Sequence, residues 1–121
     1  MLSDTRILLV EDDPYVALIC TDVLSAFGAS VAVTSTVAEA AAVAAAFTPD
    51  AILCDVGLPD GSVDDLRNLM TDVLESPSAP FFVMSGADHS DRYGGPEIAG
   101  FFLKPVRVSS IACAIAERLA R

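Results

Sequence analysis

The chain has 121 residues, of which 53% are hydrophobic, and it carries a formal net charge of −10. This length suits one domain with a well-packed core and leaves no room for a second, so we expect a single domain over residues 1–121. The negative charge disfavours nucleic acid or an anionic membrane as a direct partner, because their phosphates would repel the protein.

Short apolar runs alternate with longer amphipathic segments, which is the pattern of strand–helix units in a parallel sheet. Residues 7–10 are all apolar, as expected for a central strand that is covered on both faces. A helix is predicted from Pro14 to Phe27, with Gly28 as its stop. The residues expected on its apolar face are Val16, Ile19, Cys20, Val23, Leu24 and Phe27.

The second strand is predicted over residues 31–33, and its more alternating pattern indicates an edge of the sheet. Thr36 and Glu39 have the spacing of a capping box, so an alanine-rich second helix should begin there. The third strand, over residues 51–54, is apolar throughout and ends at Asp55.

A third helix is predicted over residues 63–74, followed by strands over residues 81–84 and 101–103. Glycines interrupt residues 86–100 and the apolar periodicity there is poor, which indicates a short or irregular fourth helix. A final amphipathic helix should turn these residues inward: Ile111, Ile115 and Leu119. The predicted fold class is therefore α/β, a doubly wound parallel sheet of five strands with helices on both faces.

Four of the five predicted strands end in a reactive side chain. These side chains belong to Glu11 and Asp12, Asp55, Ser85 and Lys104. The ligand crevice of an open parallel sheet lies outside the carboxyl ends of its strands, so we expect these residues to converge on one pocket. Carboxylates about 4 Å apart repel each other by several kcal/mol at an effective dielectric constant of about 20, which favours a bound cation. Mg²⁺ suits a site made of oxygen ligands.

Lys104 is the only lysine in the chain and would supply a positive charge opposite the acids. The Ser85 hydroxyl could donate a hydrogen bond to an oxygen of an incoming phosphoryl group. Together these groups indicate phosphoryl transfer to a carboxylate, with Asp55 as the nucleophile. Taken singly, each has an ordinary alternative. Asp13 and its acidic neighbours could cap a helix, Asp55 could be a turn residue, and Lys104 could be a surface lysine.

The chain resembles the response-regulator receiver family of two-component signalling over essentially its full length. Four segments carry the resemblance: ILLVEDD at residues 7–13, DVGLPDG at 55–61, SGA at 85–87 and FLKP at 102–105. The resemblance implies the strand order 2-1-3-4-5.

The resemblance also implies a role for each matching residue of the site. Asp55 would be the phosphoacceptor, Asp12 a direct Mg²⁺ ligand, and Glu11 a ligand acting through water. The backbone carbonyl of Gly57 would complete the metal shell.

On the opposite side of the pocket, Ser85 would be a switch hydroxyl and Lys104 would pair with the phosphoryl group. A cis peptide before Pro105 would aim this lysine. Phe101 would match an aromatic switch position that swings inward on activation, and it is equally well explained as a core aromatic of its strand.

The partners that the resemblance implies are a sensor histidine kinase or histidine phosphotransfer protein as donor, and a downstream effector protein. Two outputs fit: a change of conformation that signals to a partner protein, or onward transfer of the phosphoryl group in a relay. The chain would then catalyse only its own phosphorylation and dephosphorylation. Two alternatives stay open. One is a non-phosphorylated pseudo-receiver that serves as a binding module, which the intact acids and Lys104 count against. The other is a small aspartyl-phosphate phosphatase, for which neither a general acid near Asp55 nor a substrate cap is visible in the sequence.

The three cysteines, Cys20, Cys54 and Cys113, show neither paired nor zinc-binding spacing and lie in apolar runs. We expect all three to be reduced thiols of the core. The sequence also has neither a leader pattern nor a long uncharged apolar run, so a cytoplasmic location is expected.

Overall fold

The structure, a computed structural model, describes residues 1–73, 79–86, 98–104 and 107–120, with the backbone alone for residues 71–73. Five parallel strands form one sheet in the order β2-β1-β3-β4-β5, which confirms the predicted topology. The strands are β1 (Arg6–Val10), β2 (Ser30–Thr34), β3 (Ala51–Asp55), β4 (Phe81–Ser85) and β5 (Gly100–Leu103). The segment for which a short or irregular fourth helix was expected lies almost wholly outside the described residues.

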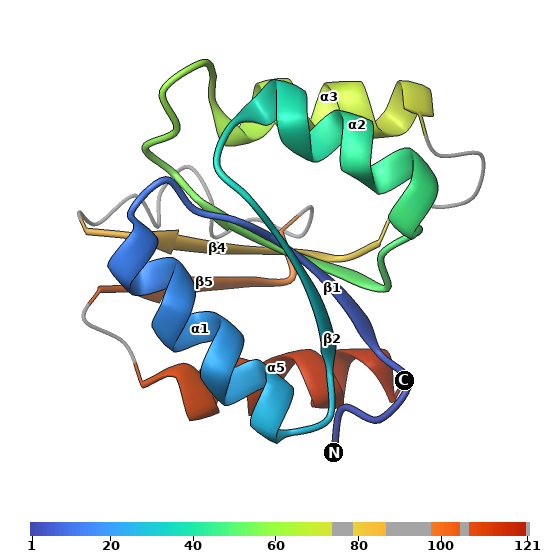
Figure 1. Cartoon of the computed structure of the whole chain (residues 1–121), viewed down its shortest axis with the longest axis vertical. Coiled ribbons are helices and arrows are strands. Elements are labelled where there is room, and N and C mark those ends of the chain that lie inside the picture. Colours follow the sequence, from blue (N-terminus) through green and yellow to red (C-terminus); the bar gives the residue numbers. More distant parts are fainter. Residues whose placement is uncertain (74–78, 87–97, 105–106, 121) are drawn as a thin grey trace.

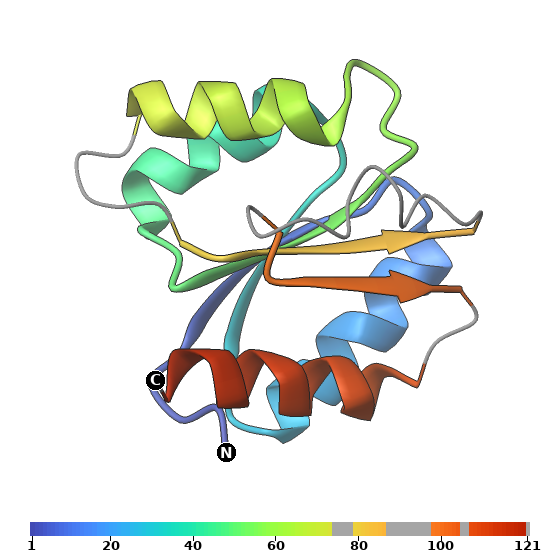
Figure 2. The same cartoon turned by 180° about the vertical axis from the view of Figure 1, so that it is seen from behind.

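The described helices cover both faces of this sheet. Figure 1 shows α2 (Val37–Phe47) and α3 (Val63–Val73) together on one face, and α1 (Pro14–Ala26) with α5 (Val108–Leu119) on the other. The reverse view in Figure 2 shows the same three layers. No helix in the described part of the chain is long and apolar enough to cross a membrane.

Strand alternation divides the core into two clusters, one on each face of the sheet. In β1, Leu9 joins the cluster beneath α1 and α5, whereas Val10 joins the cluster beneath α2 and α3. In β3, Leu53 and Cys54 follow the same two directions. Both strands are buried on both faces, which explains their uninterrupted apolar sequences.

The start of α1 follows the predicted signals. Pro14 occupies the first helical position, and the Asp13 carboxylate accepts hydrogen bonds from the amides of Tyr15 at 2.9 Å and Val16 at 3.4 Å. Asp13 is therefore a helix cap, as one of the sequence alternatives stated. At the other end Gly28 has a φ of +102°, a conformation in which a side chain would be strained.

The predicted capping box at the start of α2 is also present. The Thr36 hydroxyl accepts from the Glu39 amide at 3.0 Å. The Glu39 carboxylate in turn accepts from the amide of Ser35, also at 3.0 Å, one residue before the usual partner.

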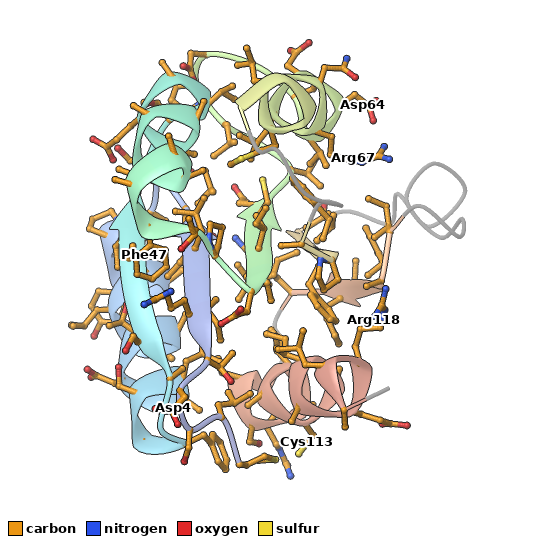
Figure 3. The ribbon with its side chains drawn as sticks, turned by 90° about the vertical axis from the view of Figure 1, so that its right-hand side faces the viewer. Asp4, Phe47, Asp64, Arg67, Cys113 and Arg118 are labelled. Carbon is orange, nitrogen blue, oxygen red and sulfur yellow. The ribbon has the colours of Figure 1, made fainter. Side chains whose placement is uncertain are left out.

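Two predictions about buried residues were wrong. Ile19 is 45% exposed, because the buried stripe of α1 is centred on Ala17, Cys20 and Leu24 and Ile19 lies beside it. Cys113 is exposed on α5, on the outer side of the helix in Figure 3.

Helical geometry explains the position of Cys113. Ile111 and Ile115 are buried beneath α5, as predicted, and Leu119 packs against the same cluster. Cys113 lies about 200° around the helix from Ile111, so it faces away from the sheet. Cys20 and Cys54 are buried free thiols, as predicted.

Candidate functional site

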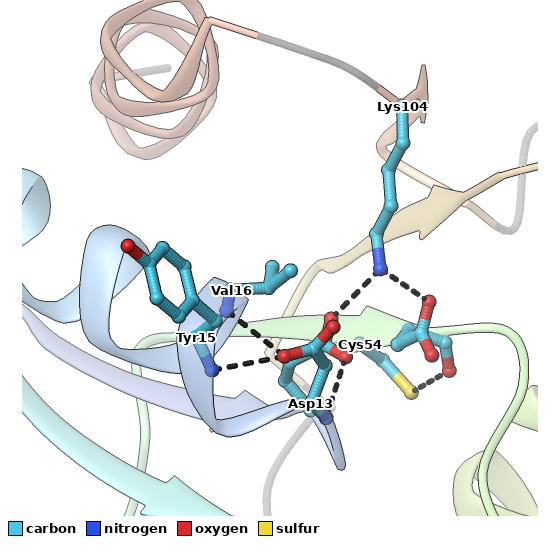
Figure 4. Close-up of polar contacts among 7 residues, drawn as sticks. Asp13, Tyr15, Val16, Cys54 and Lys104 are labelled. Atoms are coloured by element: carbon cyan, nitrogen blue, oxygen red, sulfur yellow. Dashed lines mark hydrogen bonds and ion pairs between the residues drawn. The ribbon is translucent and has the colours of Figure 1, made fainter.

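Four strand-end residues come together at the carboxyl edge of the sheet. Oxygens of the Glu11, Asp12 and Asp55 carboxylates lie within 4.8 Å of one another. The Lys104 ammonium lies 3.0 Å from Oε2 of Glu11 and 3.0 Å from Oδ1 of Asp55, so it bridges the two acids (Figure 4). This is the convergence that the strand-end pattern predicted.

The alternation of the strands explains why three of these side chains meet. Glu11 and Asp55 each stand two positions beyond a leucine that packs in the α1–α5 cluster. Lys104 stands two positions beyond Phe102, which packs against the same cluster. The three side chains therefore lie on the same side of the sheet, at the carboxyl ends of β1, β3 and β5. Cys54, one residue before Asp55, is buried on the opposite side, as expected.

The acids differ in their exposure to solvent. Glu11 is 2% exposed and Asp55 is 8% exposed, whereas Asp12 lies on the surface. Burial raises the pKa of Glu11, and the charge of Asp55 acts in the same direction, against the opposing hydrogen bonds from the Asp13 amide and Lys104. The cluster is therefore electrostatically strained, since carboxylates outnumber the one ammonium group.

Lys104 responds to the same surroundings in the opposite way. Partial burial lowers its pKa, but the hydrogen bonds and charges of Asp55 and Glu11 outweigh this effect and leave the pKa raised. The ammonium group is thus held in its charged form beside the two carboxylates. It offsets only part of their negative charge.

The residues at this site fit a hard divalent cation such as Mg²⁺. The available side-chain donors are carboxylate oxygens from one buried pair and one exposed acid. Gly57 lies beside them, since a Cβ atom on it would be 3.7 Å from Oδ2 of Asp55. The backbone of residue 57 is therefore near the acid that ends β3. An all-oxygen set with an open side is the kind that Mg²⁺ prefers, because Mg²⁺ keeps several of its waters.

Ser85 lies between the strands that bring Asp55 and Lys104 to the site. It is 3% exposed, and its backbone carbonyl accepts a hydrogen bond of 2.7 Å from the amide of Lys104. Phe101 is partly buried and packs against the α2–α3 cluster. This packing is compatible with a core residue and with a switch residue, so the switch role stays a prediction. The peptide before Pro105 lies outside the described residues.

The sequence interpretation did not single out Asp60, in the loop that follows Asp55. Its carboxylate accepts hydrogen bonds from the amides of Val37 at 2.7 Å and Ala38 at 3.1 Å, at the start of α2. Asp60 and Val37 are 23 residues apart in sequence, so no local motif marks this contact.

A shallow apolar groove beside the acids was also not foreseen. It has a volume of about 410 Å³ and runs between α1 and the edge strand β2, with Glu11 and Asp12 among its lining residues. Leu18 of α1 and Val33 of β2 are exposed apolar residues that line it, and Tyr15 and Ile19 are two further exposed apolar residues of α1. We call these four residues the α1 stripe.

Comparison with known proteins agrees with this fold and site. A family model described as "Response regulator receiver domain" matches residues 7–116. The chain therefore belongs to the response regulator receiver domain family, the receiver module of two-component signalling. Receiver domains typically interact with histidine kinases and are not themselves true enzymes. A comparison with curated protein sequences found no match.

Several solved structures are similar along nearly the whole chain. The non-phosphorylated HemR receiver domain from Leptospira biflexa has a TM-score of 0.82 and 26% identity, covering 98% of this chain and 96% of that one. A CheY-like receiver domain protein from Methanospirillum hungatei JF-1 has a TM-score of 0.84 and 23% identity, covering 96% and 94%. A sensor protein from Polaromonas sp. JS666 has a TM-score of 0.85 and 19% identity, covering 97% of both chains. The last two support the fold alone.

Proposed function

We propose that this receiver domain accepts a phosphoryl group onto Asp55 from a phosphohistidine on a partner protein, with Mg²⁺ bound by Glu11, Asp12, Asp55 and the Gly57 carbonyl. The observation that carries this proposal is the single lysine held 3.0 Å from both Glu11 and Asp55, against a cluster of acids. Phosphoryl transfer to an aspartate requires a nucleophilic carboxylate, oxygen ligands for a cation and a positioned ammonium group, and the site offers all three.

In the proposed reaction an oxygen of the Asp55 carboxylate attacks the phosphorus atom. The bond from phosphorus to the imidazole nitrogen breaks, its electron pair stays on that nitrogen, and a bond to the Asp55 oxygen forms. Mg²⁺, when bound, would neutralise negative charge on the oxygens of the transferring group. Lys104 is already charged and in place to pair with the same oxygens, so little reorganisation is required.

The phosphoryl group on Asp55 would carry a charge of about −1.5 to −2, in place of the single negative charge of the carboxylate. The Ser85 hydroxyl would donate to one of its oxygens. We propose that this rearrangement, together with a movement of Phe101, changes the surface offered to a downstream effector protein. Ser85 supports this role through its position between the strands of Asp55 and Lys104.

The α1 stripe indicates where the phosphodonor would dock. Its apolar side chains are exposed, and two of them, those of Leu18 and Val33, line the groove that also reaches Glu11 and Asp12. The helix α1 contains no basic residue, so a partner surface with apolar residues flanked by lysine or arginine would complement it. A histidine kinase or a histidine phosphotransfer protein bound there would bring its phosphohistidine to the acids.

The test is the intact mass of the protein after incubation with acetyl phosphate and Mg²⁺. We expect a gain of one phosphoryl group in the natural sequence, no gain when Mg²⁺ is chelated, and no gain in Asp55→Asn. The matched control is Asp22→Asn, which removes an exposed acid from α1 and should be phosphorylated like the natural sequence.

Two results would replace this proposal with the alternatives. A folded protein that binds Mg²⁺ but never gains mass would be a pseudo-receiver. Rapid consumption of acetyl phosphate without an adduct, still dependent on Asp55, would indicate a phosphatase instead.

A further inference from the structure

The N-terminus of α2 is capped from two separate parts of the chain. Its own cap, Thr36, uses its hydroxyl for the amide of Glu39. The first two helical amides, of Val37 and Ala38, donate instead to the two carboxylate oxygens of Asp60. Asp60 therefore provides acceptors that a helix normally finds in its own sequence.

The loop that carries Asp60 is pressed closely against the same end of α2. Leu58 is 8% exposed and belongs to the α2–α3 cluster, which also contains Val37. A Cβ atom on Gly61 would lie 3.1 Å from Cγ2 of Val37 and 3.0 Å from Oδ2 of Asp65. A side chain at position 61 would therefore require Val37 or Asp65 to shift.

This loop connects Asp55 of the acid cluster to α3. Its first amide, of Val56, donates to the carbonyl of Met84 at 3.0 Å, and its far end is fixed by hydrogen bonds between Ser62 and Asp65. Between these two anchors lies Gly57, beside the Asp55 carboxylate. Three contacts are described for this middle part of the loop. The Leu58 side chain is buried in the α2–α3 cluster, the backbone of Leu58 forms a β-bridge with Gly61, and the Asp60 carboxylate accepts hydrogen bonds from α2.

We propose that Asp60 is a positioning residue for the metal centre, because its carboxylate fixes the loop of residues 56–60 to α2 and so holds the Gly57 carbonyl beside Asp55. This inference rests on the proposed function, in which that carbonyl is a Mg²⁺ ligand. Asp60 itself takes no part in binding the cation. A backbone ligand has no rotamers to adjust, so its position depends entirely on how the loop is anchored.

The experiment is calorimetric titration of Mg²⁺ into the natural sequence, Asp60→Asn and Asp60→Ala. We expect the Kd for Mg²⁺ to rise about 3- to 10-fold in Asp60→Asn and by a larger factor in Asp60→Ala. Loss of a residue that supports a metal ligand typically weakens metal binding roughly 10- to 100-fold, and the effect in Asp60→Ala should lie near the lower end of that range. Hydrogen exchange at the amides of Gly57 and Leu58 should become faster in both variants, since the loop loses an anchor. Thermal unfolding of each variant shows whether the fold persists.

Two matched controls separate positioning from general effects. Thr36→Ala removes a cap from the same helix without touching the loop, so it should lower the melting temperature and leave the Kd unchanged. Asp50→Asn removes an equal charge and another carboxylate bond to a backbone amide, that of Arg6, at the opposite end of the sheet. It should also leave the Kd unchanged. Repeating the titrations at high ionic strength screens any purely electrostatic effect of Asp60.

The possible outcomes lead to different conclusions. If the natural sequence binds Mg²⁺ and Asp60→Asn binds it equally well, the proposed function stands and this inference is wrong. If Thr36→Ala weakens binding as much as Asp60→Asn, the stability of α2 is responsible and the inference is again wrong. If the natural sequence does not bind Mg²⁺ at all, the proposed metal site and this inference both fail.

Discussion

The two ends of the central sheet use carboxylates in different ways. At the amino end, Asp50 accepts a hydrogen bond of 2.7 Å from the amide of Arg6, whose guanidinium group donates to the hydroxyl of Thr48 at 3.3 Å. All three residues are exposed. At the carboxyl end, three carboxylates lie close together, and the two buried ones, of Glu11 and Asp55, share one ammonium group. An aspartate next to a strand is thus an ordinary backbone partner at one end and part of a charged cluster at the other.

This difference shows that position beside a strand does not decide what an acid does. Burial and the charges nearby decide it, because they determine whether ionisation is costly. A backbone amide satisfies Asp50 without repulsion. The acids at the other end repel one another, so removing charge from one of them should stabilise the fold. A binding site commonly keeps such repulsion because its function requires the charges. Substitutions at the two ends should therefore have different consequences.

The largest effect is expected from Lys104→Met, which takes the only ammonium group from the cluster. Without Mg²⁺ we expect the free energy of unfolding to fall by about 1–3 kcal/mol, because Glu11 and Asp55 lose their counter-charge. Added Mg²⁺ should restore more stability to this variant than to the natural sequence, since the cation no longer competes with a lysine. Urea unfolding at several Mg²⁺ concentrations measures both effects.

The matched change at the amino end is Arg6→Met, whose guanidinium is exposed and contacts only a hydroxyl among the described residues. Its loss should matter less, and Mg²⁺ should not compensate for it. Equal losses in the two variants, with the same response to Mg²⁺, would show that the two ends do not differ in this way.

Neutralising one acid at each end of the sheet should change the free energy of unfolding by a smaller amount, and in opposite directions at the two ends. Asp12→Asn should raise the free energy of unfolding without Mg²⁺ by about 0.5 kcal/mol, because it removes repulsion at an exposed position. Asp50→Asn should lower it by about 1 kcal/mol, because a charged acceptor of a backbone amide becomes a neutral one. Urea unfolding in a chelating buffer measures both. A loss of stability in Asp12→Asn would show that the acid cluster is not strained.

The smallest effect concerns the contribution of Asp60 to the free energy of unfolding at low pH. Hydrogen bonds from the Val37 and Ala38 amides lower the pKa of Asp60 below its usual value. Its contribution is therefore complete above about pH 4, the pKa of an unfolded aspartate, and is lost as the pH falls through the lower value in the folded state. Asp60→Asn should flatten this part of the stability profile below about pH 4. Thermal unfolding across this pH range tests it, and an unchanged profile would contradict it.

Much of the fold could be predicted because its signals are local. Uninterrupted apolar runs mark the central strands, and the Asp13 and Thr36 caps mark the starts of two helices. The convergence of Glu11, Asp55 and Lys104 was also predictable, since parallel strands present their carboxyl ends at one edge of the sheet.

What could not be predicted depends on contacts between distant segments. The cap that Asp60 provides to α2 has no local signature, because the loop reaches the helix only after both have packed on the sheet. The exposure of Ile19 follows from the way α1 seats its small Ala17 against the core, a choice that helical periodicity leaves open. The exposure of Cys113, in contrast, could have been read from the spacing of Ile111 and Ile115.

The bridge made by Lys104 also has a consequence for the order of folding. This lysine is 93 residues from Glu11 and 49 residues from Asp55 along the chain. A chain emerging from the ribosome therefore exposes all three acids long before their counter-charge is made. Contacts between such distant residues form slowly, because long loops must close first. We expect the nascent domain to carry its acids without their lysine until the last strand joins the edge of the sheet.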